Sequence, residues 1–194
     1  MLTARLLPIA ALASTAVSAA ADGPRALPIE VMNLRSSIEP SEVVGARRTG
    51  RLCGPAGSTR WSDAAPEPTR LADKVVERLR ADGHEAMTTE EADDLPEQAA
   101  RRRRLTLTVS AARIDACVPQ HGLVRLVGGR RSLKVQGTVT VHWRLSTAGE
   151  GLGTPMQGDL VATIREDDAV SIAQAVTLAI ATAVAPAVRE AAAP

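Results

Sequence analysis

The residues best suited to covalent chemistry are two cysteines and a nearby histidine. Cys53 and Cys117 are the only cysteines in the chain, and His121 follows Cys117 by four positions. A cysteine beside a histidine can act as an activated nucleophile, and the same side chains can bind zinc with further ligands. Pro119 interrupts the segment between them, and no closely spaced ligand pair recurs. A cysteine- or metal-dependent enzyme centred on Cys117 and His121 is therefore an alternative hypothesis.

An isolated cysteine pair in an exported chain more readily forms a disulfide than a redox or metal site. We therefore predict a bridge between Cys53 and Cys117. The alternative is two buried thiols that never meet, because pairing depends on a geometry that the sequence does not specify.

The first twenty residues have the pattern of a secretory signal peptide. Arg5 precedes an apolar run over residues 6–17, and the small residues Ser18, Ala19 and Ala20 follow. This pattern predicts export and cleavage after Ala20. No cysteine lies near the predicted cleavage site, so we expect no acyl anchor. Residues 21–194 are expected to form a single periplasmic domain.

The composition disfavours several classes of partner. The chain has 23 basic and 22 acidic side chains, and this balance, together with export, argues against nucleic acid. Phe and Tyr are absent, so aromatic platforms for bases or sugars are nearly excluded. Neither a glycine-rich phosphate loop nor a serine nucleophile elbow is present. We expect no cofactor and no enzymatic activity.

A basic run over residues Arg101, Arg102, Arg103 and Arg104 follows an acidic segment that begins at Glu91. The favoured interpretation is the solvated start of a strand, balanced by the acidic segment. The alternative is contact with an anionic lipid or lipopolysaccharide.

Hydrophobic periodicity predicts one helix, three alternating strands and a last helix. Strict alternation indicates a sheet covered on one side only. We expect an α+β two-layer sandwich, with a mostly antiparallel sheet of about four strands and two helices on one face. The last helix is apolar, but its polar residues gather on one side, so no transmembrane segment is expected in the mature chain. The expected elements are a strand at 26–34, an irregular excursion at 35–68, a helix at 69–83, strands at 105–114, 133–146 and 156–164, and a helix at 168–188.

The alternation assigns each strand an apolar and a polar side. Leu105, Leu107, Val109 and Ala111 are expected on the apolar side of the first long strand. The polar side of the sheet has no element left to cover it, and it is the candidate interaction surface, either through its side chains or through a free strand edge. Its expected members are Thr106, Thr108, Lys134, Gln136, Thr138, Thr140, His142 and Arg144.

The order of elements resembles a known family. The chain has Val-Gly-Ala-Arg-Arg-Thr-Gly over residues 44–50, a helix-like stretch ending at Gly83, Leu-Thr-Leu-Thr-Val over residues 105–109, a long hairpin and an alanine-rich last helix. This layout resembles the YajG-like small envelope lipoproteins of bacteria and, more loosely, the auxiliary lipoproteins of lipid-handling ABC transporters. The chain departs from both in lacking the acylated cysteine. The resemblance implies a non-catalytic envelope component that contacts partners.

The leading hypothesis is a periplasmic accessory or binding module of envelope assembly or transport, with an envelope protein as partner. The alternatives are the enzyme centred on Cys117 and His121, and a periplasmic lipid carrier that uses the space between helices and sheet.

Overall fold

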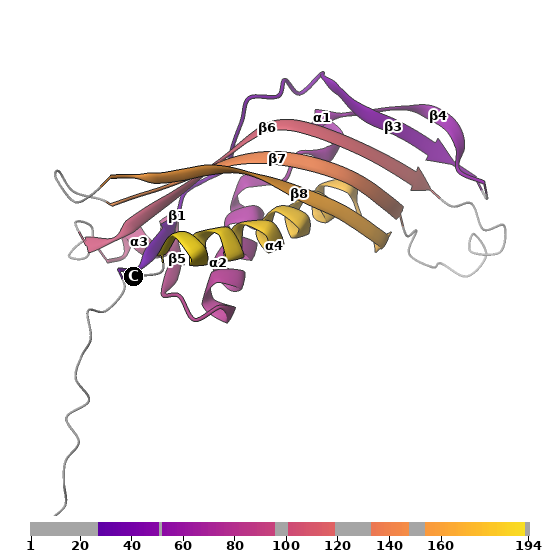
Figure 1. Ribbon diagram of the computed structural model, residues 1–194. Coiled ribbons are helices and arrows are strands. Elements are labelled where there is room, and N and C mark those ends of the chain that lie inside the picture. Colours follow the sequence, from indigo (N-terminus) through magenta and orange to yellow (C-terminus); the bar gives the residue numbers. More distant parts are fainter. Residues whose placement is uncertain (1–26, 51, 96–100, 119–132, 148–153, 193–194) are drawn as a thin grey trace, which may run out of the picture.

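The computed structural model describes residues 27–50, 52–95, 101–118, 133–147 and 154–192. The predicted signal peptide at 1–20 and His121 lie outside these ranges. The described residues form one eight-stranded mixed sheet with helices against it (Figure 1). The strands are β1 (Ile29–Val31), β2 (Arg35–Ser36), β3 (Val43–Thr49), β4 (Gly54–Arg60), β5 (Ala86–Thr88), β6 (Arg103–Val118), β7 (Leu133–Thr147) and β8 (Met156–Ala169). The helices are α1 (Trp61–Ala64), α2 (Pro68–Ala81), α3 (Thr89–Asp93) and α4 (Ile172–Ala192).

The expected fold class is wrong in the size and pairing of the sheet. Strand β6 pairs antiparallel with β7 along one edge, and β7 pairs antiparallel with β8. Along its other edge β6 pairs in succession with β1, β2 and β3, all parallel to it. Strand β5 adds to β1 and β4 adds to β3. The strand predicted at 26–34 contains β1, but its parallel pairing was not predicted. Strands β2, β3, β4 and β5 were not predicted, because they are short or lack an alternating apolar stripe.

The segment expected to be irregular at 35–68 contains β2, β3, β4 and α1. Strands β3 and β4 form a hairpin that is mostly exposed, and β4 includes Gly54, Pro55 and Gly57. Their stability comes from main-chain pairing at the edge of the sheet and not from an apolar stripe, so they show no period of two. Helix α3 includes the start of the acidic segment at Glu91, and β5 directly precedes this helix.

Helix α2 begins with Pro68 at its first position, where the missing N–H of proline costs nothing. It ends at Gly83, whose φ is +87°. The N–H groups of Gly83 and His84 donate to Arg80 and Leu79 carbonyls at 3.0 Å, the pattern of a Schellman cap. The helix thus occupies 68–81 where 69–83 was expected.

Helix α4 starts later than expected because β8 continues to Ala169. Ser171 then caps the helix, its Oγ accepting from the Gln174 N–H at 3.1 Å. The helix continues beyond Pro186 to Ala192. By length and composition α4 is long and apolar enough to span a membrane, yet it packs against β7, β8 and α2.

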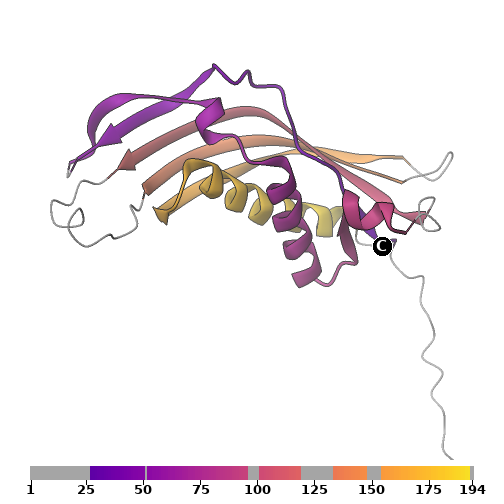
Figure 2. The same ribbon diagram turned by 180° about the vertical axis from the view of Figure 1, so that it is seen from behind.

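Helices α2 and α4 lie on the same side of the sheet, under its concave face (Figures 1 and 2). The core between them is made of aliphatic side chains and two tryptophans, Trp61 and Trp143. Gly158 lies opposite Trp143 on β8, and the indole covers it: a Cβ there would meet the ring nitrogen at 3.1 Å. The fully buried side chains of this layer include Leu105, Val139, Val141, Val176, Ile180 and Val184.

Candidate functional site

The cysteine prediction is confirmed. Cys53 and Cys117 form a disulfide with an S–S distance of 1.99 Å and a Cα–Cα distance of 5.6 Å. The bridge joins the turn between β3 and β4 to the end of β6. Cys53 has a φ of +50°, a conformation that few residues other than glycine adopt. With its sulfur bonded to Cys53, Cys117 presents no thiolate nucleophile in the oxidised protein.

The polar side chains predicted on the sheet do share one face of β6 and β7, opposite α2 and α4. None of them is buried: each is exposed or half-buried. His142 Nδ1 lies 3.0 Å from Asp159 Oδ1 on β8, so this histidine also has a polar neighbour across the strands. We call this surface the polar face; its predicted members are Thr106, Thr108, Lys134, Gln136, Thr138, Thr140, His142 and Arg144.

A bulge in β6 changes one of the predicted orientations. The pairing of β6 with β7 shifts between Val109 and Ala111, which inserts one residue and reverses the alternation beyond it. Ala111 is therefore exposed, whereas Ile114 and Ala116 return to the core. The prediction that Ala111 faces the apolar side is wrong for this reason.

The basic run does not form one solvated surface. Arg101 and Arg104 are exposed and Arg103 is half-buried, but Arg102 is only 4% exposed. Arg102 donates to the carbonyls of Ala92 at 3.0 Å and Leu95 at 3.2 Å. The prediction of a solvated run is wrong at Arg102, because this side chain closes the segment after α3 onto the sheet.

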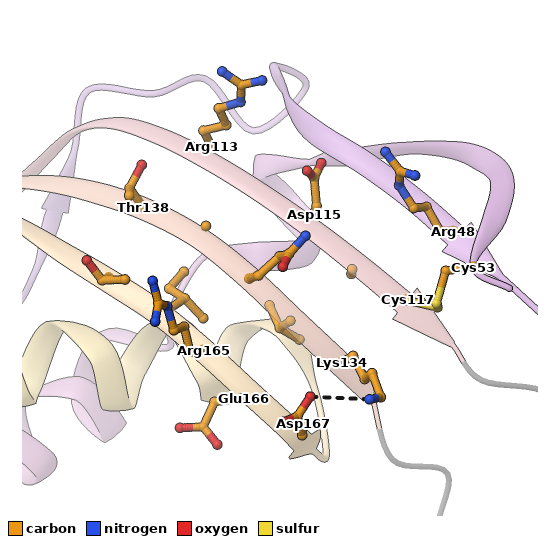
Figure 3. A pocket seen from close by; sticks show the side chains of 16 residues that line it. Arg48, Cys53, Arg113, Asp115, Cys117, Lys134, Thr138, Arg165, Glu166 and Asp167 are labelled. Atoms are coloured by element: carbon orange, nitrogen blue, oxygen red, sulfur yellow. Dashed lines mark ion pairs between the residues drawn. A yellow bond between two sulfur atoms is a disulfide. The ribbon is translucent and has the colours of Figure 1, made fainter. Parts of the chain in front are cut away.

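The polar face is hollowed near the disulfide. A cavity of about 900 Å³ opens there across β3, β6, β7 and β8 (Figure 3). We call it the basic trough and define it by its outward side chains: Arg48, Arg113, Asp115, Lys134, Gln136, Thr138, Thr163, Arg165 and Asp167. Lys134, Gln136 and Thr138 were predicted members of the polar face. The sequence analysis missed the others because the trough depends on the register that aligns four strands.

Two close contacts shape the trough. A Cβ on Gly137 would lie 2.0 Å from the Arg113 carbonyl oxygen, and a Cβ on Gly45 would lie 1.8 Å from that of Ile114. Only glycine allows the strands to approach this closely. Beside Gly45, the Ala46 N–H donates to Asp115 Oδ1 at 2.9 Å, so Asp115 anchors β3 to β6. Asp115 therefore has a structural role.

Within the described residues, no group of three or more His, Cys, Asp or Glu side chains is arranged to hold a metal ion. Two carboxyl groups have clearly shifted pKa values, and both lie on the helical side. The Thr88 N–H, and then Arg80, lower the pKa of Glu91 below its usual value. A hydrogen bond from Lys74 lowers the pKa of Glu77.

No family model and no curated protein matches the chain. A structure described as an uncharacterized protein aligns over 87% of this chain and 94% of its own, with 12% identity and a TM-score of 0.46.

Two further solved structures are similar at the same level. A PelC dodecamer from Paraburkholderia phytofirmans aligns over 84% of this chain and 88% of its own, with 15% identity and a TM-score of 0.41. Protein XCC0632 from Xanthomonas campestris, of family DUF330, aligns over 87% of this chain and 84% of its own, with 13% identity and a TM-score of 0.41. At these scores the similarity assigns neither a family nor a function, and the YajG-like resemblance is not confirmed.

Proposed function

We propose that this chain is a non-catalytic binding module of the periplasm, an accessory component of envelope assembly or transport, and that it acts through its polar face. The observation that carries the proposal is the division of the sheet into two unlike faces. One face of β7 and β8 is packed against α4, and α2 packs against α4, β1 and β5 on the same side. The other keeps a continuous set of threonine, amide and basic side chains in contact with solvent.

The chemistry of this face suits a reversible contact. Hydroxyl and amide groups bond water and protein partners equally well, and polar surfaces with bridging water are common in non-obligate interfaces. Lys134 and Arg144 add exposed positive charge. The Cys53–Cys117 bridge agrees with an oxidising compartment such as the periplasm.

Binding at the polar face is better supported than binding of a ligand between the helices and the sheet. The side chains of Val139, Val141, Ile180 and Val184 fill that layer and are 0% exposed. The cavity of about 900 Å³ lies on the opposite, polar face. The lipid-carrier alternative therefore has no observation in its favour.

Charge reversal on the polar face tests the proposal. Lys134→Glu and Arg144→Glu are expected to abolish partner capture from the envelope fraction of the native host. Both residues are exposed, and Lys134 also loses its surface ion pair with Asp167, so the free energy of unfolding is expected to fall by less than about 1 kcal/mol. The matched control is Arg70→Glu, an exposed residue on α2, which is expected to leave capture unchanged. If the reversed variants capture the same partners as the parent protein, the proposal is wrong.

A further inference from the structure

Three arginines, each from a different strand, line the basic trough. Arg48 lies on β3, Arg113 on β6 and Arg165 on β8, and all three side chains are exposed (Figure 3). None of the three has an ion-pair or side-chain hydrogen-bond partner in the part of the chain that the structure describes. Their donors are therefore available to a ligand.

The carboxylates of the trough, in contrast, are already engaged or turned away. Asp115 Oδ1 accepts the Ala46 N–H at 2.9 Å. Asp167 Oδ1 lies 3.4 Å from Lys134 Nζ, the ion pair drawn in Figure 3. Glu166 alternates with Arg165 along β8, so its carboxylate points to the other side of the sheet (Figure 3). The lining residues include four basic and three acidic side chains, a net charge of +1. Lys134 forms an ion pair with Asp167, and the uncompensated charge lies with the arginines.

The positions of the arginines indicate how many charged groups a bound anion would have. Strand β7 lies between β6 and β8, and Arg113 lies opposite Thr138 whereas Arg165 lies opposite Gln136. Two strand spacings across the sheet and two residues along it separate the two backbones by about 12 Å. The register places Arg113, Thr138 and Thr163 side by side across the three strands. Gln136 and Thr138 on β7 therefore lie between the two basic residues on the polar face. Arg48 lies opposite Cys117 on β6, three strand spacings or about 14 Å from β8. Three cationic side chains spread over four strands favour an anion with more than one charged group.

We propose that the basic trough binds a multivalent anion, an elongated molecule with two or more carboxylate or phosphate groups and hydrogen-bonding groups between them. Guanidinium groups bind both kinds of acid through paired N–H donors, and the volume is that of a site for a small ligand. The inference rests on the proposed function, because it treats the polar face as a binding surface and names the chemistry of what binds there.

Calorimetric titration of the oxidised mature protein at low ionic strength tests the inference. The probes are inorganic triphosphate, a galacturonic acid tetramer as the carboxylate source, and inorganic phosphate as the small anion. We expect at least one multivalent probe to bind, and inorganic phosphate to bind at least about tenfold more weakly. Binding of triphosphate alone identifies a phosphate ligand, and binding of the tetramer alone identifies an acidic sugar. Added salt is expected to weaken binding.

Variants locate the site. Arg113→Gln and Arg165→Gln are each expected to lower the affinity for the probe that binds about tenfold. The matched control is Arg70→Gln, which removes an exposed guanidinium group from α2 on the opposite side of the molecule, and its effect is expected to be less than about twofold. The inference is overturned if neither multivalent probe binds at millimolar concentration, or if the control weakens binding as much as the trough variants.

The outcome is separable from that of the proposed function. If the probes fail while Lys134→Glu and Arg144→Glu still abolish partner capture, the anion site is wrong and the binding module stands. If the probes bind as expected while those reversals leave capture unchanged, the anion site stands and the proposed partner surface is wrong.

Discussion

Arg102 Nη1 lies 3.6 Å from Glu30 Oε2 inside the protein, where both side chains are 5% exposed. Glu30 is on β1, at the centre of the parallel part of the sheet, and Arg104 Nε reaches the same carboxylate oxygen at 3.3 Å. Arg102 also donates to the carbonyls of Ala92 and Leu95. One side chain therefore joins β1, the start of β6 and the segment after α3.

Replacing Arg102 is expected to be costly. Arg102→Met removes the donor to the Leu95 carbonyl and one of the donors to the Ala92 carbonyl. It also leaves Glu30 with a single, half-exposed partner, Arg104. Removing one member of a buried ion pair typically lowers the free energy of unfolding by about 3 kcal/mol or more. Denaturant unfolding measures this loss. The control Arg101→Met removes an exposed side chain of the same run and is expected to change stability by less than about 0.5 kcal/mol. Equal effects of the two variants would contradict the structural role of Arg102.

The disulfide is expected to stabilise the protein only under oxidising conditions. Cys53 and Cys117 are 64 residues apart in the chain, and opening a loop of this length costs about 4 kcal/mol in the chain-entropy model. Cys53→Ser is therefore expected to lower the free energy of unfolding by about that amount without reductant, and to match the reduced parent protein. Free thiols in parent protein purified without reductant would rule the bridge out.

The capping box of α3 predicts a pH dependence. Thr88 Oγ1 accepts the Glu91 N–H, and the Glu91 carboxylate accepts the Thr88 N–H at 2.9 Å. Because the folded pKa of Glu91 lies below its usual 4.5, its ionised form stabilises the fold above that pH. This contribution disappears as the pH falls through the folded pKa.

Glu91→Ala is accordingly expected to lower the free energy of unfolding by about 1 kcal/mol at neutral pH. Solvent screens part of this effect, because the side chain is half-exposed. The cost is expected to shrink at acidic pH. Glu91→Gln keeps a capping side chain without the charge, so its own cap contribution should not vary with pH. A cost of Glu91→Ala that stays constant down to pH 3 would contradict the assignment.

Gly137 is expected to be indispensable to the trough. A methyl group there would lie 2.0 Å from the Arg113 carbonyl oxygen, so β6 and β7 would have to separate. Gly137→Ala is expected to lower the free energy of unfolding by about 2 kcal/mol. Gly54→Ala is the control, because its Cβ would lie 3.9 Å from the Thr49 carbonyl oxygen, an ordinary contact. A melting temperature unchanged by Gly137→Ala would show that the strands do not approach this closely.

The sequence allowed prediction of the elements whose apolar residues repeat with a regular period. Leu107, Val139 and Ile164 alternate with polar residues, and all three are buried. The sequence could not reveal partners held by main-chain pairing alone. Strands β3 and β4 have almost no buried side chains, and β2 is two exposed residues long.

The same limit applies to the candidate site. Thr138 and Lys134 belong to a clean alternation, so they were predicted on the polar face. Arg48 and Arg165 join them only through the register that β6 and β7 impose on β3 and β8. Local charge patterns were also insufficient: Arg102 is buried because it meets Glu30, 72 residues earlier in the chain.

The central claim is that the polar face, and not the helical side, contacts the partner. Thr138 on β7 and Thr182 on α4 form a matched pair, since both are exposed threonines on opposite sides of the molecule. A photo-crosslinking residue placed at each position in the exported protein, in its native host, tests the claim directly. The account predicts a discrete crosslinked partner from position 138 and none from position 182. A partner crosslinked from position 182 alone, or no adduct from position 138, would contradict it.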